Sequence, residues 1–130
     1  MAIYKDTVVT HEFLDLNPNA YYVYGENIER KGRGDLAKLR EHPHALGFIT
    51  KKFADDEDSS FYRPEEYSPI FFEELNKLAS IIEKRPDKIF YISPLGSSSR
   101  ANKYRIWELL ISHNLVRKLE KFKNVVFCWT

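Results

Sequence analysis

Apolar residues along the chain alternate between short continuous runs and longer stretches with helical spacing. The short runs are rich in β-branched and aromatic residues, and they predict strands at residues 3–9, 21–24, 45–50, 89–92 and 124–129. The helical spacing predicts a short helix that begins at Arg33 or Asp35 and two long helices, at residues 68–84 and 104–122. Pro69 suits the first position of the helix at 68–84, and residues 112–114 could divide the helix at 104–122.

Strands that alternate with amphipathic helices are typical of a mostly parallel sheet with helices on both faces. The sequence therefore predicts an α/β fold in three layers. Its 130 residues suit one domain with a sizeable core, so we expect a single domain spanning residues 1–130. Sheets of this kind bind ligands beyond the carboxyl ends of their strands. The loops that follow the predicted strands are therefore the first place to look for function.

One of these loops combines small residues, hydroxyls and a cation. The apolar run 89–92 is followed by Pro94 and then by Leu95, Gly96, Ser97, Ser98, Ser99 and Arg100. Main-chain N–H groups, hydroxyls and the start of the next helix together favour a bound phosphate or diphosphate. We expect residues 95–100 to bind such a group, with a flexible connector as the alternative. The chain lacks the GxxxxGK[ST] motif, which argues against a hydrolytic nucleoside triphosphatase.

A second loop, residues 25–34, follows the predicted strand at 21–24 and carries three glycines. Glycines let the backbone approach a ligand closely, and an asparagine amide offers both a donor and an acceptor to a base or ribose. Arginines and a lysine in this loop could neutralise phosphate, although a basic surface turn is the alternative. The candidate ligand-binding residues are Gly25, Asn27, Gly32, Arg33 and Gly34.

Thr50 and Lys51 end the predicted strand at 45–50 and would add a hydroxyl and an ammonium group. Because the carboxyl ends of parallel strands share one edge of a sheet, we expect these two residues and both loops to face the same ligand. The convergence of the two loops is the main functional prediction from the sequence.

Composition narrows the classes of function. The 20 basic and 19 acidic residues give a net charge of +1, which argues against a protein that coats nucleic acid. The single cysteine, Cys128, lies in an apolar run and is expected to be a core residue rather than a nucleophile. His42 and His44 have no partner at metal-ligand spacing, so we predict no metal site and no cofactor. The chain shows no signal peptide or membrane span, so we expect a cytoplasmic protein.

Acidic residues lie in or beside the second loop and within another charged segment. Glu26, Glu29 or Asp35 could act as a general base, with pairing to nearby cations as the alternative. No spacing indicates a nucleophile and its base, so the catalytic residues stay unassigned. Residues 55–58 are all acidic, so we expect them to form a solvated segment. The aromatic residues after it, Phe61, Tyr62 and Tyr67, are expected to be exposed, on a lid or at the interface of a homo-oligomer.

Residues 22–27, 32–34 and 47–51 read as [FY]-V-[FY]-G-x-N, G-x-G and G-x-x-T-K. In this the chain resembles small uncharacterised phage and bacterial proteins. The pattern is in turn similar to the ADP-ribose-binding core of macrodomains, where a strand ends in asparagine before a glycine-rich loop and a later strand ends in a phosphate loop. On this resemblance, Asn27 and residues 32–34 match the first element, and residues 95–100 match the second.

The resemblance implies a macrodomain-like or Rossmann-like three-layer fold that binds a nucleotide. The loop at 25–34 carries Arg30, Lys31 and Arg33 where macrodomains have more glycines, and the loop at 95–100 carries serines where glycines are usual. Nucleotide binding therefore carries over better than de-ADP-ribosylating activity does.

We accordingly expect a protein that binds an ADP-ribose-like or cyclic signalling nucleotide between the two loops. A phage protein of this kind could sequester a signal of its host. One alternative is an enzyme, a glycohydrolase or phosphoesterase, acting on the same ligand. The other is a nucleic-acid or protein-interaction module with a basic face formed by Arg30, Lys31, Arg33, Arg100, Lys103 and Arg105.

Overall fold

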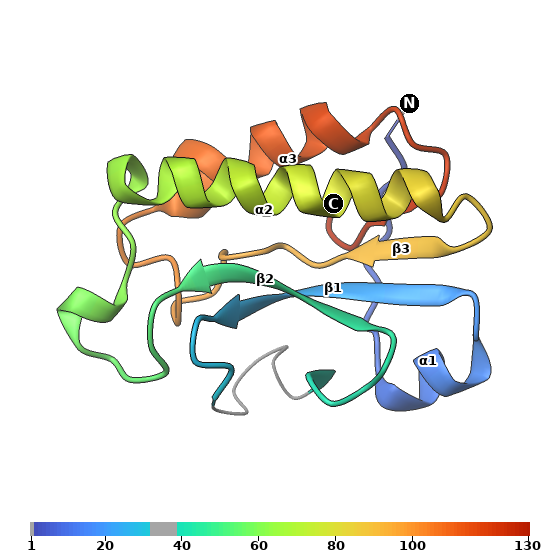
Figure 1. Ribbon diagram of the computed structural model, residues 1–130, viewed down its shortest axis with the longest axis horizontal. Helices are drawn as coiled ribbons and strands as arrows, with labels where there is room; N and C mark the ends of the chain where they lie inside the picture. Colours follow the sequence, from blue (N-terminus) through green and yellow to red (C-terminus); the bar gives the residue numbers. More distant parts are fainter. Residues whose placement is uncertain (1, 32–38) are drawn as a thin grey trace.

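The computed structural model, which describes residues 2–31 and 39–130, contains a four-stranded parallel sheet with helices on both faces (Figure 1). The strands are β1 (Ala20–Asn27), β2 (Ala45–Lys51), β3 (Ile89–Ile92) and β4 (Val125–Phe127). The helices are α1 (His11–Leu16), α2 (Pro64–Lys84) and α3 (Ser112–Leu119), with a 3-10 turn η2 (Asp58–Ser60) and a π-helical turn η3 (Trp107–Ile111). Helices α2 and α3 lie on one face of the sheet and α1 lies on the other, so the predicted α/β class is confirmed.

The order of the strands in the sheet is β2-β1-β3-β4. The chain therefore moves from β1 to one side to form β2, and then crosses over β1 to form β3 on its other side. The connections on the two sides of β1 run in opposite directions, which makes the space beyond β1 and β3 a topological switch point. Open parallel sheets bind their ligands at such points.

Alternation along the strands sends side chains into two apolar clusters. Tyr22 and Tyr24 of β1 pack on the side of α1, whereas Val23 packs beneath α2 and α3. Helix α2 buries Phe71, Leu75, Leu78 and Ile82, which recur at helical spacing on one side. Each such side chain contributes about 1.5 to 3 kcal/mol when fully buried.

The predicted strand at residues 3–9 is wrong. Only Tyr4 forms a bridge, to Phe127 of β4, and the Lys5 N–H donates to the Phe127 carbonyl at 2.8 Å. The short helix α1, which the sequence analysis missed, begins after Thr10, whose side chain accepts the Phe13 N–H at 3.0 Å. A threonine at this position stabilises a helix start, because it satisfies a main-chain donor that the helix itself leaves unpaired.

The two long helices are found, with shifted ends. Helix α2 begins at Pro64 instead of residue 68, and Pro69 lies inside it. The residues between the two prolines are helical because Tyr67 belongs to the buried face. The last helix runs from 106 to 119 and changes from π to α geometry at Ser112, where a division was predicted. The short helix predicted to begin at Arg33 or Asp35 starts outside the residues that the structure describes.

Among the described residues, no helix combines the length and apolar character needed to cross a membrane.

Candidate functional site at the carboxyl edge of the sheet

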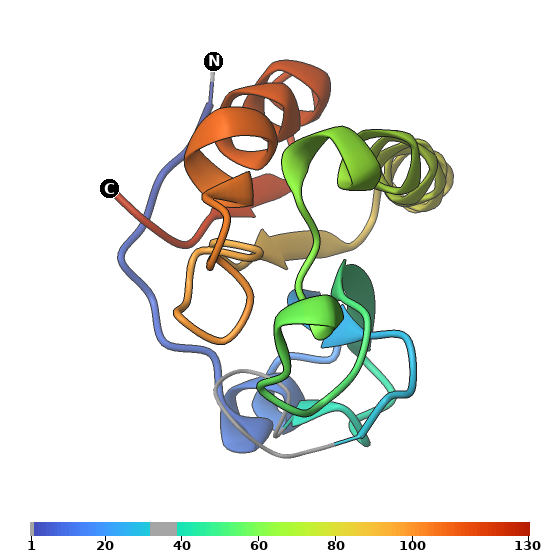
Figure 2. The same cartoon turned by 90° about the vertical axis from the view of Figure 1, so that its left-hand side faces the viewer.

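The carboxyl ends of β1, β2 and β3 lie at the edge of the sheet that faces the viewer in Figure 2, where the turn after β1 and the loop after β3 leave the sheet in different directions. A Cβ atom on Gly25 of β1 would lie 3.6 Å from the Gly96 nitrogen and 3.1 Å from Thr50 Oγ1. A Cβ atom on Gly96 would lie 3.5 Å from Thr50 Cγ2. Gly25, Thr50 and Gly96, all predicted site residues, therefore meet at one point of this carboxyl edge.

The loop after β3 is held in shape by its own hydrogen bonds. Gly96 has a φ of +77°, in the left-handed region that favours glycine. The N–H groups of Ala101 and Asn102 both donate to the Ser98 carbonyl, at 3.0 and 2.9 Å. The Arg100 N–H donates to Ser98 Oγ at 3.3 Å. These bonds form consecutive tight turns that are complete before the next helix begins.

That helix begins later than predicted and is capped by Asn102. Asn102 Oδ1 accepts the Trp107 N–H at 3.0 Å, and its Nδ2 donates to Glu108 Oε1 at 2.9 Å. The first turn of the helix is thus satisfied by a side chain that follows the serines. The expectation that the helix start points at the serines is wrong, so only the loop's own groups can serve an anion there.

The serine loop offers hydroxyl and main-chain donors. Ser98, Ser99 and Arg100 are exposed, and Ser97 is half-buried. Across residues 2–31 and 39–130, no acceptor is bonded to the N–H groups of Ser98 and Ser99. Leu95 differs from its neighbours, because its side chain is buried in the core and its N–H donates to the Ser93 carbonyl at 2.8 Å. Its side chain therefore contributes to packing instead of ligand binding.

Asn27 ends β1, and its amide is bound within its own turn. Its Nδ2 donates to the Lys31 carbonyl at 2.8 Å, and its Oδ1 accepts the Lys31 N–H at 3.3 Å. Inside this turn, Arg30 has a φ of +57°, which is uncommon for a residue other than glycine. Asn27 therefore braces a strained turn, with both of its amide atoms engaged.

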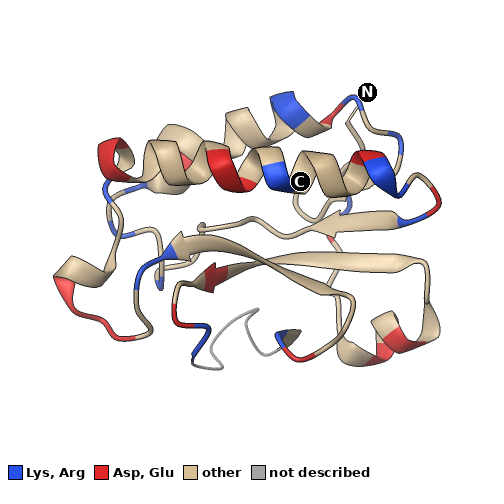
Figure 3. Cartoon of the chain, viewed as in Figure 1, with Lys and Arg blue, Asp and Glu red and all other residues tan. Residues whose placement is uncertain are grey.

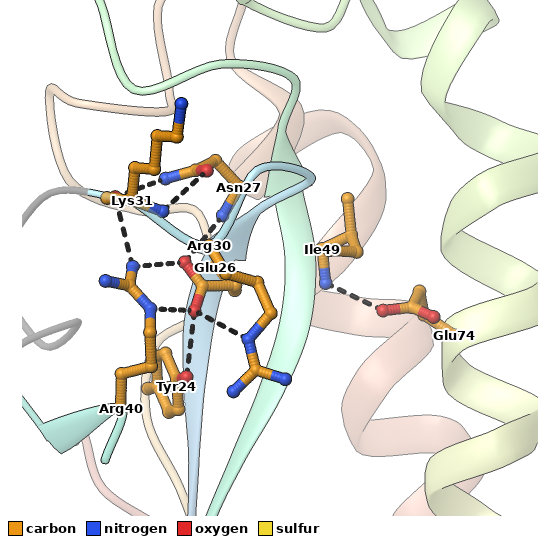
Figure 4. A network of polar contacts seen from close by, with 8 residues as sticks. All are labelled: Tyr24, Glu26, Asn27, Arg30, Lys31, Arg40, Ile49 and Glu74. Carbon is orange, nitrogen blue, oxygen red and sulfur yellow. Dashed lines mark hydrogen bonds and ion pairs between the residues drawn. The ribbon is translucent and has the colours of Figure 1, made fainter.

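Glu26, beside Asn27, is the centre of a buried ion pair (Figure 4). Arg40 donates through Nε and Nη2 to the two carboxylate oxygens, at 2.5 Å each. The Tyr24 hydroxyl donates to Oε2 at 2.9 Å, and the Asn27 N–H donates to Oε1 at 3.0 Å. Burial raises the pKa of Glu26, but the hydrogen bonds from Arg40 and Tyr24 outweigh it and hold the pKa below its usual value. Glu26 is therefore an ionised, fully bonded carboxylate.

The same contacts act on Tyr24, the other side chain at this end of β1. Burial, followed by its hydrogen bond to Glu26, raises the pKa of Tyr24 to about 12. Gly47 of β2 makes room for both side chains, since a Cβ atom there would lie 3.2 Å from Glu26 Cβ and 3.4 Å from the Tyr24 hydroxyl. Gly47 is therefore suited to its place in β2, because a larger residue there would crowd Glu26 and Tyr24.

The other two predicted candidates for a general base are Glu29 and Asp35. The Glu29 carboxylate pairs with a lysine, since its Oε2 lies 3.5 Å from Lys31 Nζ, and Asp35 lies outside the described residues. Gly32, Arg33 and Gly34 also lie outside them, so the role of this part of the glycine loop stays a prediction. Burial raises the pKa of the Cys128 thiol to about 11, which makes it a poor nucleophile.

Lys51 ends β2 and is buried in spite of its charge. Its Nζ lies 4.5 Å from the ring centroid of Phe61 and 3.8 Å from Asp56 Oδ1. Lys103 Nζ, from the loop after β3, lies 5.4 Å from the same ring centroid. Lysines from two separate segments are thus held against one aromatic side chain at the carboxyl edge.

Sequence reasoning missed these aromatic partners, because Phe61, Tyr62 and Tyr67 were expected to be exposed, whereas all three are buried. Arg63 also lies over an aromatic ring, 4.1 Å from the centroid of Tyr104. The signal was the proximity of cations to aromatic residues in the sequence, at residues 61–63 and 103–104. Cations are attracted to the faces of aromatic rings, so this pattern predicts cation–π contacts.

An acidic side chain lies beside three residues of the proposed basic face, Arg30, Lys103 and Arg105. Lys103 Nζ lies 2.8 Å from Asp58 Oδ1, Arg105 Nε lies 3.8 Å from Glu108 Oε2, and Arg30 Nε lies 4.0 Å from Glu26 Oε2. Figure 3 shows basic and acidic segments side by side at this edge of the sheet. These cations therefore do not form an uninterrupted basic surface.

No group of three or more histidines, cysteines and carboxylates in residues 2–31 and 39–130 is arranged to hold a metal ion. An open groove of about 420 Å³ lies away from the carboxyl edge, against α3 and the two terminal segments. It is lined by Tyr4, Ser112, His113, Val116, Arg117, Glu120 and Trp129, none of which was a predicted site residue.

Comparison with known proteins gives a family for the chain but no function. Residues 4–96, which include β1, β2, α2 and β3 and end at Gly96, match the model of a family of unknown function, DUF7831. No curated protein matches the chain. No solved structure matches it either. Because the matched residues cover more than half of the sequence, the chain belongs to the DUF7831 family, whose function is unknown.

Proposed function

We propose that the protein binds a small phosphorylated nucleotide at the carboxyl edge of the sheet, between the turn after β1 and the loop after β3. The observation that carries this proposal is the close approach of Gly25 and Gly96 at the topological switch point. Ligands of open parallel sheets bind at this place, because two neighbouring loops diverge there.

The groups available at the edge suit a phosphate. Ser98 and Ser99 are exposed and have unbonded N–H groups within the described part of the chain. Arg100 follows them, and a guanidinium binds phosphate oxygens in a fixed, two-pronged geometry. Hydroxyls, main-chain donors and a cation together recognise an anion without any catalytic group.

The state of Glu26 supports binding over catalysis. A general base works best when its pKa lies near the operating pH, and it must be free to reach a proton. The Glu26 carboxylate is buried, bonded to Arg40 and Tyr24, and has a lowered pKa. An enzymatic role as glycohydrolase or phosphoesterase would need a different base.

The resemblance to macrodomains and to phage proteins supports a nucleotide of the ADP-ribose or cyclic signalling type. A protein that holds such a nucleotide without turning it over would act by sequestering it, in the cytoplasm where these signals are made. A basic nucleic-acid module is less well supported, because Lys103 and Arg105 are paired with carboxylates.

Calorimetric titration with a panel of ADP-ribose, cyclic mononucleotides and cyclic dinucleotides tests the proposal. Ser99→Glu places a negative charge in the loop and should weaken binding by more than about tenfold. Ser80→Glu adds the same charge at the far end of α2 and should leave the affinity unchanged. Binding of none of these nucleotides at millimolar concentration would rule the proposal out.

Chromatography of the nucleotide after incubation separates the two classes of function. Intact recovery of a bound nucleotide is the expected result. Turnover of the nucleotide would instead indicate an enzyme of the same ligand class.

A further inference from the structure

The segment that joins β2 to α2 lies across the proposed site. This acidic strap, residues 52–63, leaves β2 and carries η2 beyond the carboxyl end of β1 before entering α2 (Figures 1 and 2). Its shape is fixed by the Lys52 N–H, which donates to the Ser60 carbonyl at 2.9 Å, and by Ser60 Oγ, which donates to Asp55 Oδ1 at 2.5 Å. The strap is therefore an ordered element placed next to the loop after β3.

One carboxylate of the strap collects donors from two segments. Lys103 Nζ lies 2.8 Å from Asp58 Oδ1, and the Tyr104 hydroxyl donates to the same oxygen. Arg63 Nη2 lies 4.0 Å from Asp58 Oδ2. The hydrogen bond from Lys103, followed by that from Tyr104, lowers the pKa of Asp58. This is the donor set that a phosphate group would use, with a carboxylate in its place.

The cations of this set are also held from behind by aromatic rings. Lys103 lies over Phe61, at 5.4 Å from its centroid, and Arg63 lies over Tyr104 at 4.1 Å. Because these contacts do not involve Asp58, the cations would keep their places if the carboxylate left. A preorganised cluster of cations binds an incoming anion at a lower entropic cost.

We propose that Arg63, Lys103 and Tyr104 form a second anion subsite of the nucleotide site, which Asp58 fills until a phosphate group of the ligand replaces it. The exchange is feasible because the side chains of Asp58 and Lys103 are 62% and 45% exposed, and exposed ion pairs are weak. A diphosphate carries more charge and more acceptor oxygens than one carboxylate, so it competes well for the same donors.

The position of the subsite defines the class of ligand. Lys103 follows Arg100 by three residues on the same loop, so one ligand can touch both the serine loop and the subsite. Two anionic groups in one molecule are then required. This deepening of the proposed function selects a diphosphate or a dinucleotide over a nucleotide with a single phosphate.

Pyrophosphate and inorganic phosphate are the probes that test the subsite, by calorimetry at low salt. Asp58→Asn removes the competing charge and should tighten pyrophosphate binding about tenfold. The control is Glu57→Gln, which removes the same charge one residue away. Among the described residues, the structure shows no ion pair of the Glu57 side chain, so this change should alter the affinity by less than about twofold. Lys103→Gln in the Asp58→Asn background should abolish the gain.

Three results of the pyrophosphate titrations would overturn the subsite. They are equal affinities of Asp58→Asn and Glu57→Gln, a gain that survives Lys103→Gln, and no binding of pyrophosphate to either wild type or Asp58→Asn. Unfolding curves of each variant confirm that the fold is intact. Nucleotide binding that is equal in wild type and Asp58→Asn would remove the subsite but leave the proposed function standing. Pyrophosphate binding without any nucleotide binding would do the reverse.

Discussion

Glu26 shows how this small sheet accommodates a buried charge. Its side chain is 2% exposed, yet both carboxylate oxygens are bonded to Arg40, and Tyr24 and a main-chain N–H complete the set. A buried charge of this kind is tolerated only when nearly all of its bonding capacity is used. The arrangement fixes the end of β1, from which the predicted site extends.

Arg40→Met should be strongly destabilising, because it leaves the Glu26 carboxylate buried without its partner. Breaking a buried pair from one side costs about 3 to 5 kcal/mol. Urea unfolding measures the loss, and Glu26→Gln combined with Arg40→Met should recover part of it. Arg117→Met, at an exposed arginine of α3, is the control. A loss no larger than that of the control would contradict a structural role for the pair.

The lowered pKa of Glu26 also predicts how stability depends on pH. A carboxyl group with a lower pKa in the folded state stabilises the fold fully above its unfolded pKa, and this stability is lost as the pH falls through the folded pKa. The free energy of unfolding should therefore decline in wild type below a pH of about 4.5, the unperturbed value. Glu26→Gln should flatten that decline. Parallel slopes for the two proteins would show that Glu26 is not the group responsible.

Gly96 should not tolerate a side chain. Its φ of +77° is strained for alanine, which costs about 1 to 2 kcal/mol, and a Cβ would approach Ile111 Cδ1 to 2.8 Å. Gly96→Ala should lower the urea midpoint accordingly. Repeating the change in an Ile111→Val background, which lacks that methyl group, separates crowding from backbone strain. Unchanged stability in both backgrounds would mean that the loop after β3 differs from its described shape.

At the scale of elements, β2 is an edge strand whose outer side is covered by α2. The Ile49 N–H donates to Glu74 Oε1 at 2.8 Å, and the Tyr67 hydroxyl donates to the Ile49 carbonyl (the Ile49–Glu74 contact is drawn in Figure 4). Unpaired edges invite pairing with other chains. Two side chains of one helix thus satisfy both main-chain groups of a residue that would otherwise be available.

Glu74→Ala should expose this edge. We expect a loss of about 1 to 2 kcal/mol, since the Ile49 N–H loses its acceptor, and self-association that increases with protein concentration. Light scattering and urea unfolding measure the two effects. Glu73→Ala changes an exposed glutamate that pairs with Lys77 at 3.3 Å and should do neither. A Glu74→Ala variant that is monomeric and fully stable would show that the hydrogen bond from Ile49 to Glu74 is not needed to protect this edge.

The elements that the sequence predicted well are those whose pattern agrees with their burial. The strands β2 and β3 were found almost to the residue, because both are apolar runs bounded by turn formers. The first predicted strand failed, since β-branched residues at 3–9 give only the bridge of Tyr4 to Phe127. The start of α2 was predicted at residue 68, beside Pro69, whereas the helix begins at Pro64, because the burial of Tyr67 extends it.

At the scale of the whole molecule, the strand order explains why three residues of the candidate site could be predicted to lie together. Parallel strands put their following loops at one edge, so the meeting of Gly25, Thr50 and Gly96 follows from the pattern alone. The pairing of Tyr104 with Asp58 joins residues 46 positions apart, and no local spacing reports it. The same holds for Arg40 and Glu26, which are 14 positions apart. Local propensity therefore predicted the layout, whereas long-range ion pairs needed the structure.

The central claim is that the carboxyl edge at β1 and β3 holds an anionic nucleotide. The most direct measurement is a map of amide chemical-shift changes in the labelled protein during titration with ADP-ribose and a cyclic dinucleotide. We predict the largest changes at Gly25, Thr50 and residues 96–100, with smaller changes along the acidic strap. No change at any concentration, or changes confined to the groove lined by Tyr4, Arg117 and Trp129, would contradict the account.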